Sequence, residues 1–158
     1  KTGSFGYFVG GKLRLTFGRA DLMANAAFGE HTFSIAKDTN GGGNVPQVAD
    51  VAYRQIKGGL STRVPFGRIF ALVAGGNYLY LLGVGQLQSP DYFPYLTGSG
   101  GEGYTGLAVR VATKIEVRAT INLRAYVFTM NTQRGDPREA EGAVDQYLGL
   151  NLSVALRD

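Results

Sequence analysis

The sequence predicts an all-β protein built as an antiparallel up-and-down barrel, and three observations lead to this prediction. Apolar and polar residues alternate with a period of two along several long segments, as they do in a strand whose two faces differ. Glycine accounts for 24 of the 158 residues, about twice its average share. The connections between the predicted strands are alternately short and long. We expect a single domain over residues 1–158, because this length suits one closed sheet but not two ordinary domains.

The composition excludes several classes of protein. The chain has no cysteine, which rules out disulfide scaffolds, thiolate metal sites and cysteine nucleophiles. Its single histidine excludes a histidine-rich metal centre, and no apolar run is long enough for a membrane-spanning helix. No exposed interleaving of basic and aromatic residues points to nucleic acid. We therefore expect no metal, no cofactor and no nucleic-acid partner.

The first two strands are predicted at 4–17 and 22–36. In the first, the odd positions from Phe5 to Phe17 are mostly aromatic or aliphatic, while the even positions are mostly small or charged. The second strand alternates less regularly, and its pattern changes phase near Gly29 and Glu30. A β-bulge would account for such a change.

Three strands follow in the middle of the chain, at 50–64, 69–85 and 104–113. The first of these alternates between residues such as Ile56 or Leu60 and residues such as Lys57 or Arg63. The segment 69–85 is apolar on both faces.

The last two strands, at 115–128 and 146–156, repeat the alternation of the first. Between Ile115 and Phe128 the odd positions are apolar and the even positions mostly polar, and the final strand places a leucine or valine at every even position from Leu148 to Leu156. Helical spacing explains neither pattern. The total is seven strands.

The connections alternate in length. Short turns are predicted at 18–21, 65–68 and 113–114, whereas the long loops at 37–49, 86–103 and 130–145 are rich in glycine, proline, asparagine and aspartate. In an up-and-down sheet every second connection lies at the same end. One rim of the barrel should therefore be tight while the other carries the long loops.

A period of two does not reveal whether the apolar face points inward, as in a soluble barrel, or outward into lipid. Strands of about 14 residues exceed the usual length in globular sheets and suffice to cross a bilayer at a tilt. The polar face is also rich in small residues that would suit the inside of a narrow barrel, including Gly6, Gly10, Gly59, Gly75 and Gly149. These features favour an antiparallel up-and-down transmembrane β-barrel.

In its pattern over 5–17, 115–128 and 148–156, the chain resembles the small eight-stranded outer-membrane barrels of the OmpA/OmpX type. The resemblance covers nearly the whole length but includes no diagnostic motif. It implies a location in the bacterial outer membrane of a Gram-negative cell, with the short turns in the periplasm and the long loops outside. Such barrels have an even number of strands. We therefore hypothesise that an eighth, N-terminal strand is missing from the sequence or is supplied by another segment or chain.

This topology places a basic cluster in the lumen and acidic residues in the loops. The predicted lumen holds one carboxylate, Glu116, with seven cations: Lys12, Arg14, Lys57, Arg63, Arg110, Arg118 and Arg124. Unpaired charges cannot remain in a dry interior. Either the lumen is wet, or the missing strand brings carboxylates, or an anionic partner enters.

Few residues suggest chemistry. His31 and Ser34 are a histidine and a serine of the kind that outer-membrane lipases pair, but three residues apart they lie on opposite faces of a regular strand. The stretch 37–45 begins like a calcium loop, yet Ala49 stands where such a loop needs its bidentate glutamate. The aromatic residues of the loop 86–103, which are candidates for a partner contact or a membrane-interface belt, are Tyr92, Phe93 and Tyr95.

The expected function is therefore non-enzymatic: an outer-membrane barrel with a structural, tethering, adhesive or complex-forming role. Its expected partners are outer-membrane lipid or lipopolysaccharide, and a protein at the loops, the rim or an open strand edge. One alternative is a narrow, porin-like, anion-permeable pore with a basic lumen. Another is a soluble up-and-down barrel that binds an apolar ligand between Leu13, Leu15, Ile121, Leu123 and Leu150.

Overall fold

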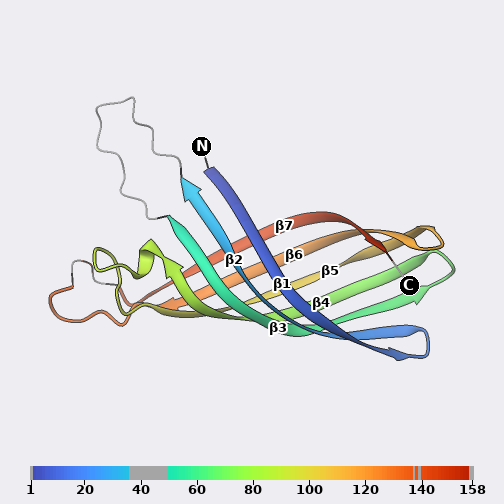
Figure 1. Cartoon of the computed structure of the whole chain (residues 1–158), viewed down its shortest axis with the longest axis horizontal. Coiled ribbons are helices and arrows are strands. Elements are labelled where there is room, and N and C mark those ends of the chain that lie inside the picture. The colour runs from blue at the N-terminus through green and yellow to red at the C-terminus, as the bar shows by residue number, and fades with distance from the viewer. Residues whose placement is uncertain (1, 36–49, 137, 139, 157–158) are drawn as a thin grey trace.

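Seven antiparallel strands form one sheet in the computed structural model, which describes residues 2–35, 50–136, 138 and 140–156. The strands follow one another in chain order, β1 to β7, and the β4–β5 connection contains a short 3₁₀ helix, η1 (Figure 1). The elements are β1 Thr2–Phe17, β2 Ala20–Ile35, β3 Val51–Phe66, β4 Phe70–Gly85, η1 Gln86–Gln88, β5 Thr97–Ala112, β6 Ile115–Thr129 and β7 Gly142–Leu156. In the part of the chain described, no helix has the length and hydropathy to cross a membrane.

The predicted bulge near Gly29 is wrong. Strand β2 pairs with β1 and with β3 in an unbroken register through Gly29 and Glu30. The phase looked disturbed because the face of β2 that is apolar from Leu22 to Phe28 continues with Glu30, Thr32 and Ser34. The carboxylate of Glu30 pairs there with Arg54 on the neighbouring strand, Nε to Oε2 at 3.4 Å. Register irregularities occur instead between β3 and β4 near Arg54, and between β5 and β6 near Arg110.

Two strands, β5 and β7, begin at least four residues earlier than the sequence predicts, so the predicted long loops before them are shorter. Strand β5 begins at Thr97 rather than at 104, and β7 begins at Gly142 rather than at 146. The glycine-rich stretch before Tyr104 looks like a loop in the sequence. In the structure two of its glycines face aromatic rings of β6: a Cβ at Gly98 would lie 2.7 Å from the ring of Phe128, and one at Gly100 would lie 2.8 Å from the ring of Tyr126. Glu102 and Asp145 consequently belong to strands.

The two ends of the sheet differ. Short turns at 18–19, 67–69 and 113–114 lie at one end, here called the short-turn end, and the connections 86–96 and 130–141 lie at the other, the long-connection end (Figure 1). The predicted alternation of short and long connections is therefore present. Because seven strands alternate in direction, the first and the last run the same way, from the long-connection end to the short-turn end.

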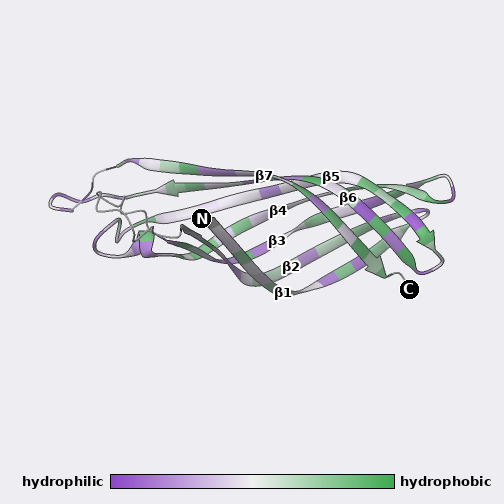
Figure 2. Ribbon diagram, turned by 90° about the horizontal axis from the view of Figure 1, so that it is seen from above, coloured by the Kyte–Doolittle hydropathy of each residue, from purple (hydrophilic) through white to green (hydrophobic). Residues whose placement is uncertain are grey.

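The sheet does not close into a barrel. Among the described residues, β1 is hydrogen-bonded to β2 only and β7 to β6 only, so one edge of each strand has no strand partner. Figure 2 shows the curved sheet with hydrophobic and hydrophilic residues alternating along its strands. The interval between the free edges of β1 and β7 is called the seam below.

The apolar residues point away from the enclosed side of the sheet. Leu13, Ile121 and Leu152 expose 64%, 54% and 76% of their surface. The five residues predicted to line an apolar ligand cavity in a soluble barrel are all exposed on this outer face: Leu13, Leu15, Ile121, Leu123 and Leu150. The opposite face is concave, because side chains on it meet across strands that are not neighbours, and it holds most of the charged residues that lie on strands.

Candidate functional site

The concave face contains three groups of ion pairs and a cluster of aromatic residues. The first group lies toward the short-turn end. There the carboxylate of Glu116 on β6 is fully buried and accepts hydrogen bonds from Arg63 on β3, at 2.6 and 3.0 Å. Arg118, two residues along β6, donates a third bond to it at 2.9 Å. A guanidinium on either side thus fixes this carboxylate in a buried position.

The second group centres on Glu102 of β5. Its carboxylate accepts two bonds from Arg124 at 2.6 and 3.0 Å, one from Lys57 Nζ at 3.1 Å and one from Asn77 Nδ2 at 2.7 Å. These partners come from β6, β3 and β4. The ammonium of Lys57 also lies 4.3 Å from the centroid of the Phe8 ring on β1, within range of a cation–π interaction.

The third group is formed within the first hairpin. Arg14 of β1 donates two bonds to Asp21 of β2, at 2.9 and 3.1 Å, and the hydroxyl of Thr16 donates a third at 3.2 Å. The carboxylate of Asp21 is buried, while about half of the Arg14 side chain is exposed at the seam.

Aromatic and aliphatic side chains fill the concave side toward the long-connection end. The rings of Tyr53 and Tyr126 stack with centroids 4.3 Å apart, and Phe128 stacks against Tyr53 at 5.9 Å. The hydroxyl groups of the two tyrosines have hydrogen-bond partners: Tyr53 donates to Asp145 and Tyr126 donates to Gln55. The buried residues of this cluster, called the aromatic plug below, are Tyr53, Leu79, Val84, Leu96, Tyr126, Phe128 and Met130.

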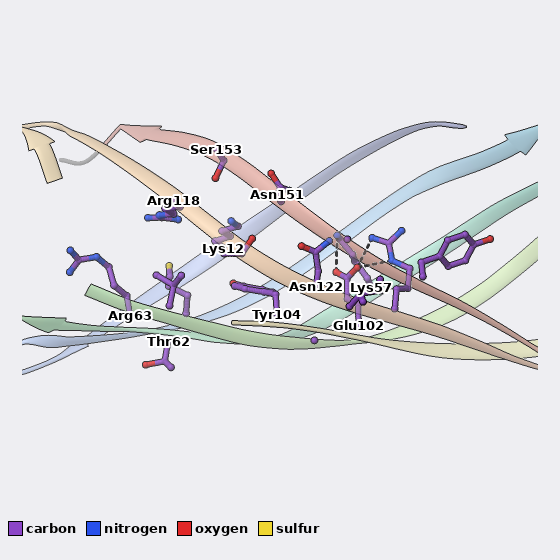
Figure 3. A pocket seen from close by; sticks show the side chains of 18 of the residues that line it. Lys12, Lys57, Thr62, Arg63, Glu102, Tyr104, Arg118, Asn122, Asn151 and Ser153 are labelled. Carbon is purple, nitrogen blue, oxygen red and sulfur yellow. Dashed lines mark hydrogen bonds and ion pairs between the residues drawn. The ribbon is translucent and has the colours of Figure 1, made fainter. Parts of the chain in front are cut away.

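A cavity of about 490 Å³ lies among these ion pairs, and polar and charged side chains from β1, β3, β5, β6 and β7 line it (Figure 3). Its lining includes Lys12, Lys57, Arg118, Asn151 and Ser153. The side chains of Lys12 and of the two β7 residues border it from opposite sides of the seam.

The structure brings together most of the predicted basic cluster, but with more carboxylates than the sequence suggested. Five of the seven cations form ion pairs: Arg14, Lys57, Arg63, Arg118 and Arg124. Within the described residues, Lys12 and Arg110 have none. The expectation of a single interior carboxylate was wrong because the sequence placed Asp21, Glu102 and Asp145 in turns and loops, whereas all three lie on strands.

His31 meets a different serine from the one considered in the sequence. Its Nε2 lies 2.7 Å from Oγ of Ser4, on the neighbouring strand, whereas Ser34 takes no part. The register of the first hairpin is the feature that would have identified Ser4. It pairs Gly6 with His31, so the even positions of β1, including Ser4, lie close to the histidine. Within the described residues, the buried Nδ1 of His31 has no hydrogen-bond partner. The carboxylate that would orient the base of a catalytic triad is thus not in place there.

The three loop aromatics have different environments. Phe93 packs against the aromatic plug, and the ring of Tyr92 lies 4.6 Å from the guanidinium carbon of Arg138. Tyr95 is exposed, while its backbone oxygen accepts a bond from Asn131. Of the three, Tyr95 offers the most side-chain surface to a partner.

The calcium-loop-like stretch 37–45, with Ala49, lies outside the described residues. No group of residues that could hold a metal ion occurs in the ranges the structure describes.

Comparison of the chain with protein-family models, with curated proteins and with solved structures gives no match.

Proposed function

We propose that this chain forms most of a transmembrane β-barrel in the bacterial outer membrane, with a non-enzymatic role in structure, tethering or adhesion. The observation that carries the proposal is the orientation of the sheet: β1, β3, β4, β6 and β7 each expose several large apolar side chains on the outer face, β2 and β5 add Phe28, Leu107 and Val111, and the buried ion pairs lie on the concave face. Water would make so large an exposed apolar surface costly. Lipid removes that cost, and it favours charges that are paired away from it.

The spacing of outward aromatic residues supports the same proposal. Tyr7 and Phe17 are ten residues apart on β1, and Phe70 and Tyr80 are ten residues apart on β4; all four are exposed on the outer face. A tilted strand needs about 9–11 residues to cross the hydrocarbon layer. Aromatic side chains separated by this length would form belts at both interfaces. Tyr104 is not part of such a belt, because its side chain lines the cavity.

A barrel in lipid must have no open edge, because unpaired backbone N–H and C=O groups are costly there. Strands β1 and β7 run in the same direction, so a direct contact between them would be a parallel pair. One additional strand, running from the short-turn end to the long-connection end, would be antiparallel to both. We therefore include an eighth strand at the seam in the proposal.

The alternatives receive less support. A pore needs a continuous water path, and the aromatic plug fills the concave side toward the long-connection end with buried, mostly apolar side chains. A soluble ligand barrel needs an apolar interior, whereas this one holds paired charges. The partners that fit best are lipid or lipopolysaccharide on the outer face and a protein at the long connections, where Tyr95 is exposed.

The test is to place a charge on the outer face. Leu123 on β6 is 54% exposed, so Leu123→Arg should be harmless if this face meets water. If it meets hydrocarbon, an arginine near the middle of the strand should destabilise the folded barrel by about 2–4 kcal/mol. The free energy of unfolding would be measured by urea titration in phospholipid vesicles, together with the shift in mobility between unheated and boiled samples on denaturing gels.

The matched control is Ile69→Arg. Ile69 is also exposed and apolar, but it lies in the turn 67–69, outside the proposed membrane span. We expect its free energy of unfolding to change by less than about 1 kcal/mol. Equal effects of the two substitutions, or a protein that stays monomeric in buffer without detergent, would contradict a membrane location.

A further inference from the structure

The two edges of the seam differ in charge. On β1 the side chain of Lys12 belongs to the concave face and lines the cavity, yet among the described residues it forms no ion pair. On β7 the polar side chains that line the same cavity are neutral and able to donate hydrogen bonds: Asn151 and Ser153 (Figure 3), and Tyr147 farther along the strand. One cation and two neutral donors thus face one another across the place where a strand is lacking.

The charges on the concave face are unequal in number. The cations are Lys12, Arg14, Lys57, Arg63, Arg110, Arg118 and Arg124, and the carboxylates are Asp21, Glu102, Glu116 and Asp145. The first three carboxylates are each bonded to at least one guanidinium, and Asp145 accepts from Tyr53. All four carboxylates of the concave face are therefore already engaged by groups of the seven strands. None of these ion pairs includes Lys12, whose side chain is exposed at the open seam. A strand that closed the seam would cover this ammonium, and a charge kept from water needs a partner.

We propose that the strand closing the seam carries an inward carboxylate opposite Lys12, held by its ammonium on one side and by Asn151 and Ser153 on the other. This inference rests on the proposed barrel, and it adds the chemistry of the strand that completes it. The occupant is a single amphipathic strand with apolar residues facing outward, small residues facing inward and one aspartate or glutamate at this position.

A second copy of the chain does not fit the seam. Two copies inserted in the membrane with the same orientation would bring β1 of one beside β7 of the other, and these strands run in the same direction. The seam calls for a strand of the opposite direction, and both of its edges provide unpaired backbone groups for an antiparallel ladder.

The experiment adds such a strand to the complete chain. A designed segment of sixteen residues, the length of β1, is joined through a flexible loop to residue 1, with valine or leucine facing outward and glycine or serine facing inward. One version has glutamate opposite Lys12, and the matched version has glutamine. Both are made in the unchanged chain, in Lys12→Gln and in Lys114→Gln, which removes a cation from the turn 113–114.

The readouts are the gel mobility of unheated samples and the equilibrium constant for unfolding by urea in phosphatidylcholine vesicles. In the unchanged chain we expect the equilibrium constant for unfolding to be about tenfold smaller for the glutamate version than for the glutamine version. The difference should fall below about twofold in Lys12→Gln and persist in Lys114→Gln.

The outcomes separate this inference from the proposed barrel. If both versions give a heat-sensitive folded band but glutamate and glutamine are equally stable, the barrel stands and the paired carboxylate is wrong. If neither version gives a folded band or raises the stability, closure by an eighth strand is wrong, and the inference fails with it. If inorganic phosphate raises the glutamine version to the stability of the glutamate version, a free anion rather than a strand carboxylate occupies the position, which also overturns the inference.

Discussion

Glu116 has no exposed surface, and two guanidinium groups from different strands donate to its carboxylate. Its place in the sequence, two residues before Arg118 on the same face of β6, suggests only a local pair. The stronger partner is Arg63, which is more than fifty residues away in sequence and reaches it from β3 at 2.6 Å. At the scale of the residue, the concave side is thus held by pairings between distant strands, in which one carboxylate serves more than one cation.

Removing the charge of Glu116 should therefore be costly. We expect Glu116→Gln to lower the free energy of unfolding by about 3–5 kcal/mol, because Arg63 stays buried after losing its partner charge. Urea titration in vesicles would measure the change.

The control for this prediction is Glu30→Gln. Glu30 pairs with Arg54 at 3.4 Å on the outer face, and most of the arginine side chain is exposed. In the register Glu30 lies beside Tyr7 of β1, at the level of the proposed aromatic belt and not in the hydrocarbon layer, and an exposed pair there contributes about 0–1 kcal/mol. A loss at Glu116 no larger than the loss at Glu30 would show that the buried pair does not support the fold.

At the scale of the element, the glycines of β5 make room for the side chains of the strand beside it. A Cβ at Gly100, on the concave face, would lie 2.5 Å from the backbone oxygen of Ala125 and 2.8 Å from the ring of Tyr126. Its neighbour Gly101 faces the other way, and a Cβ there would come no closer than 3.9 Å to Asn77. The glycine-rich composition of β5 is therefore a packing requirement on one face only.

These adjacent glycines form a matched pair of tests. Gly100→Ala should reduce the free energy of unfolding by about 1–3 kcal/mol, because the backbone of β6 would have to move. Gly101→Ala should leave the free energy of unfolding unchanged or raise it by about 0.4–1 kcal/mol, because alanine restricts the unfolded chain and clashes with no atom in the folded one. The prediction fails if the two variants have the same urea midpoint.

At the scale of the whole molecule, the concave side combines a polar cavity with an apolar end. The ion pairs around Glu102 and Glu116 surround the cavity, while Tyr53, Tyr126 and Phe128 stack toward the long-connection end. The stacked rings and the aliphatic side chains beside them leave little space there for a column of water. Paired cations also offer less to a passing anion than the free cations of a basic conduit would.

We therefore expect no steady ion current when the protein is reconstituted in a planar bilayer. Tyr126→Ala, which removes a ring from the centre of the aromatic plug, is the variant most expected to admit current. Leu123→Ala on the outer face of the same strand is its control. A steady, anion-selective current from the unchanged protein would overturn the structural role and favour the narrow pore.

The sequence by itself determined the strand class, the seven strands found in the described residues and the identity of the two faces, because alternation with a period of two is a local property of a strand. It located strand ends less well. In the segment 98–103 glycines that pack beneath aromatic rings look the same as glycines in a loop. The sequence analysis therefore placed Lys57 and Arg124 on the interior face but missed Glu102, the carboxylate that they share.

Only the tertiary structure decided which charges meet, since Arg63 with Glu116 and Lys57 with Glu102 join strands that are not neighbours. It also decided that the apolar face is the outer one. A strand pattern distinguishes two faces, but which of them becomes concave depends on how the whole sheet curves.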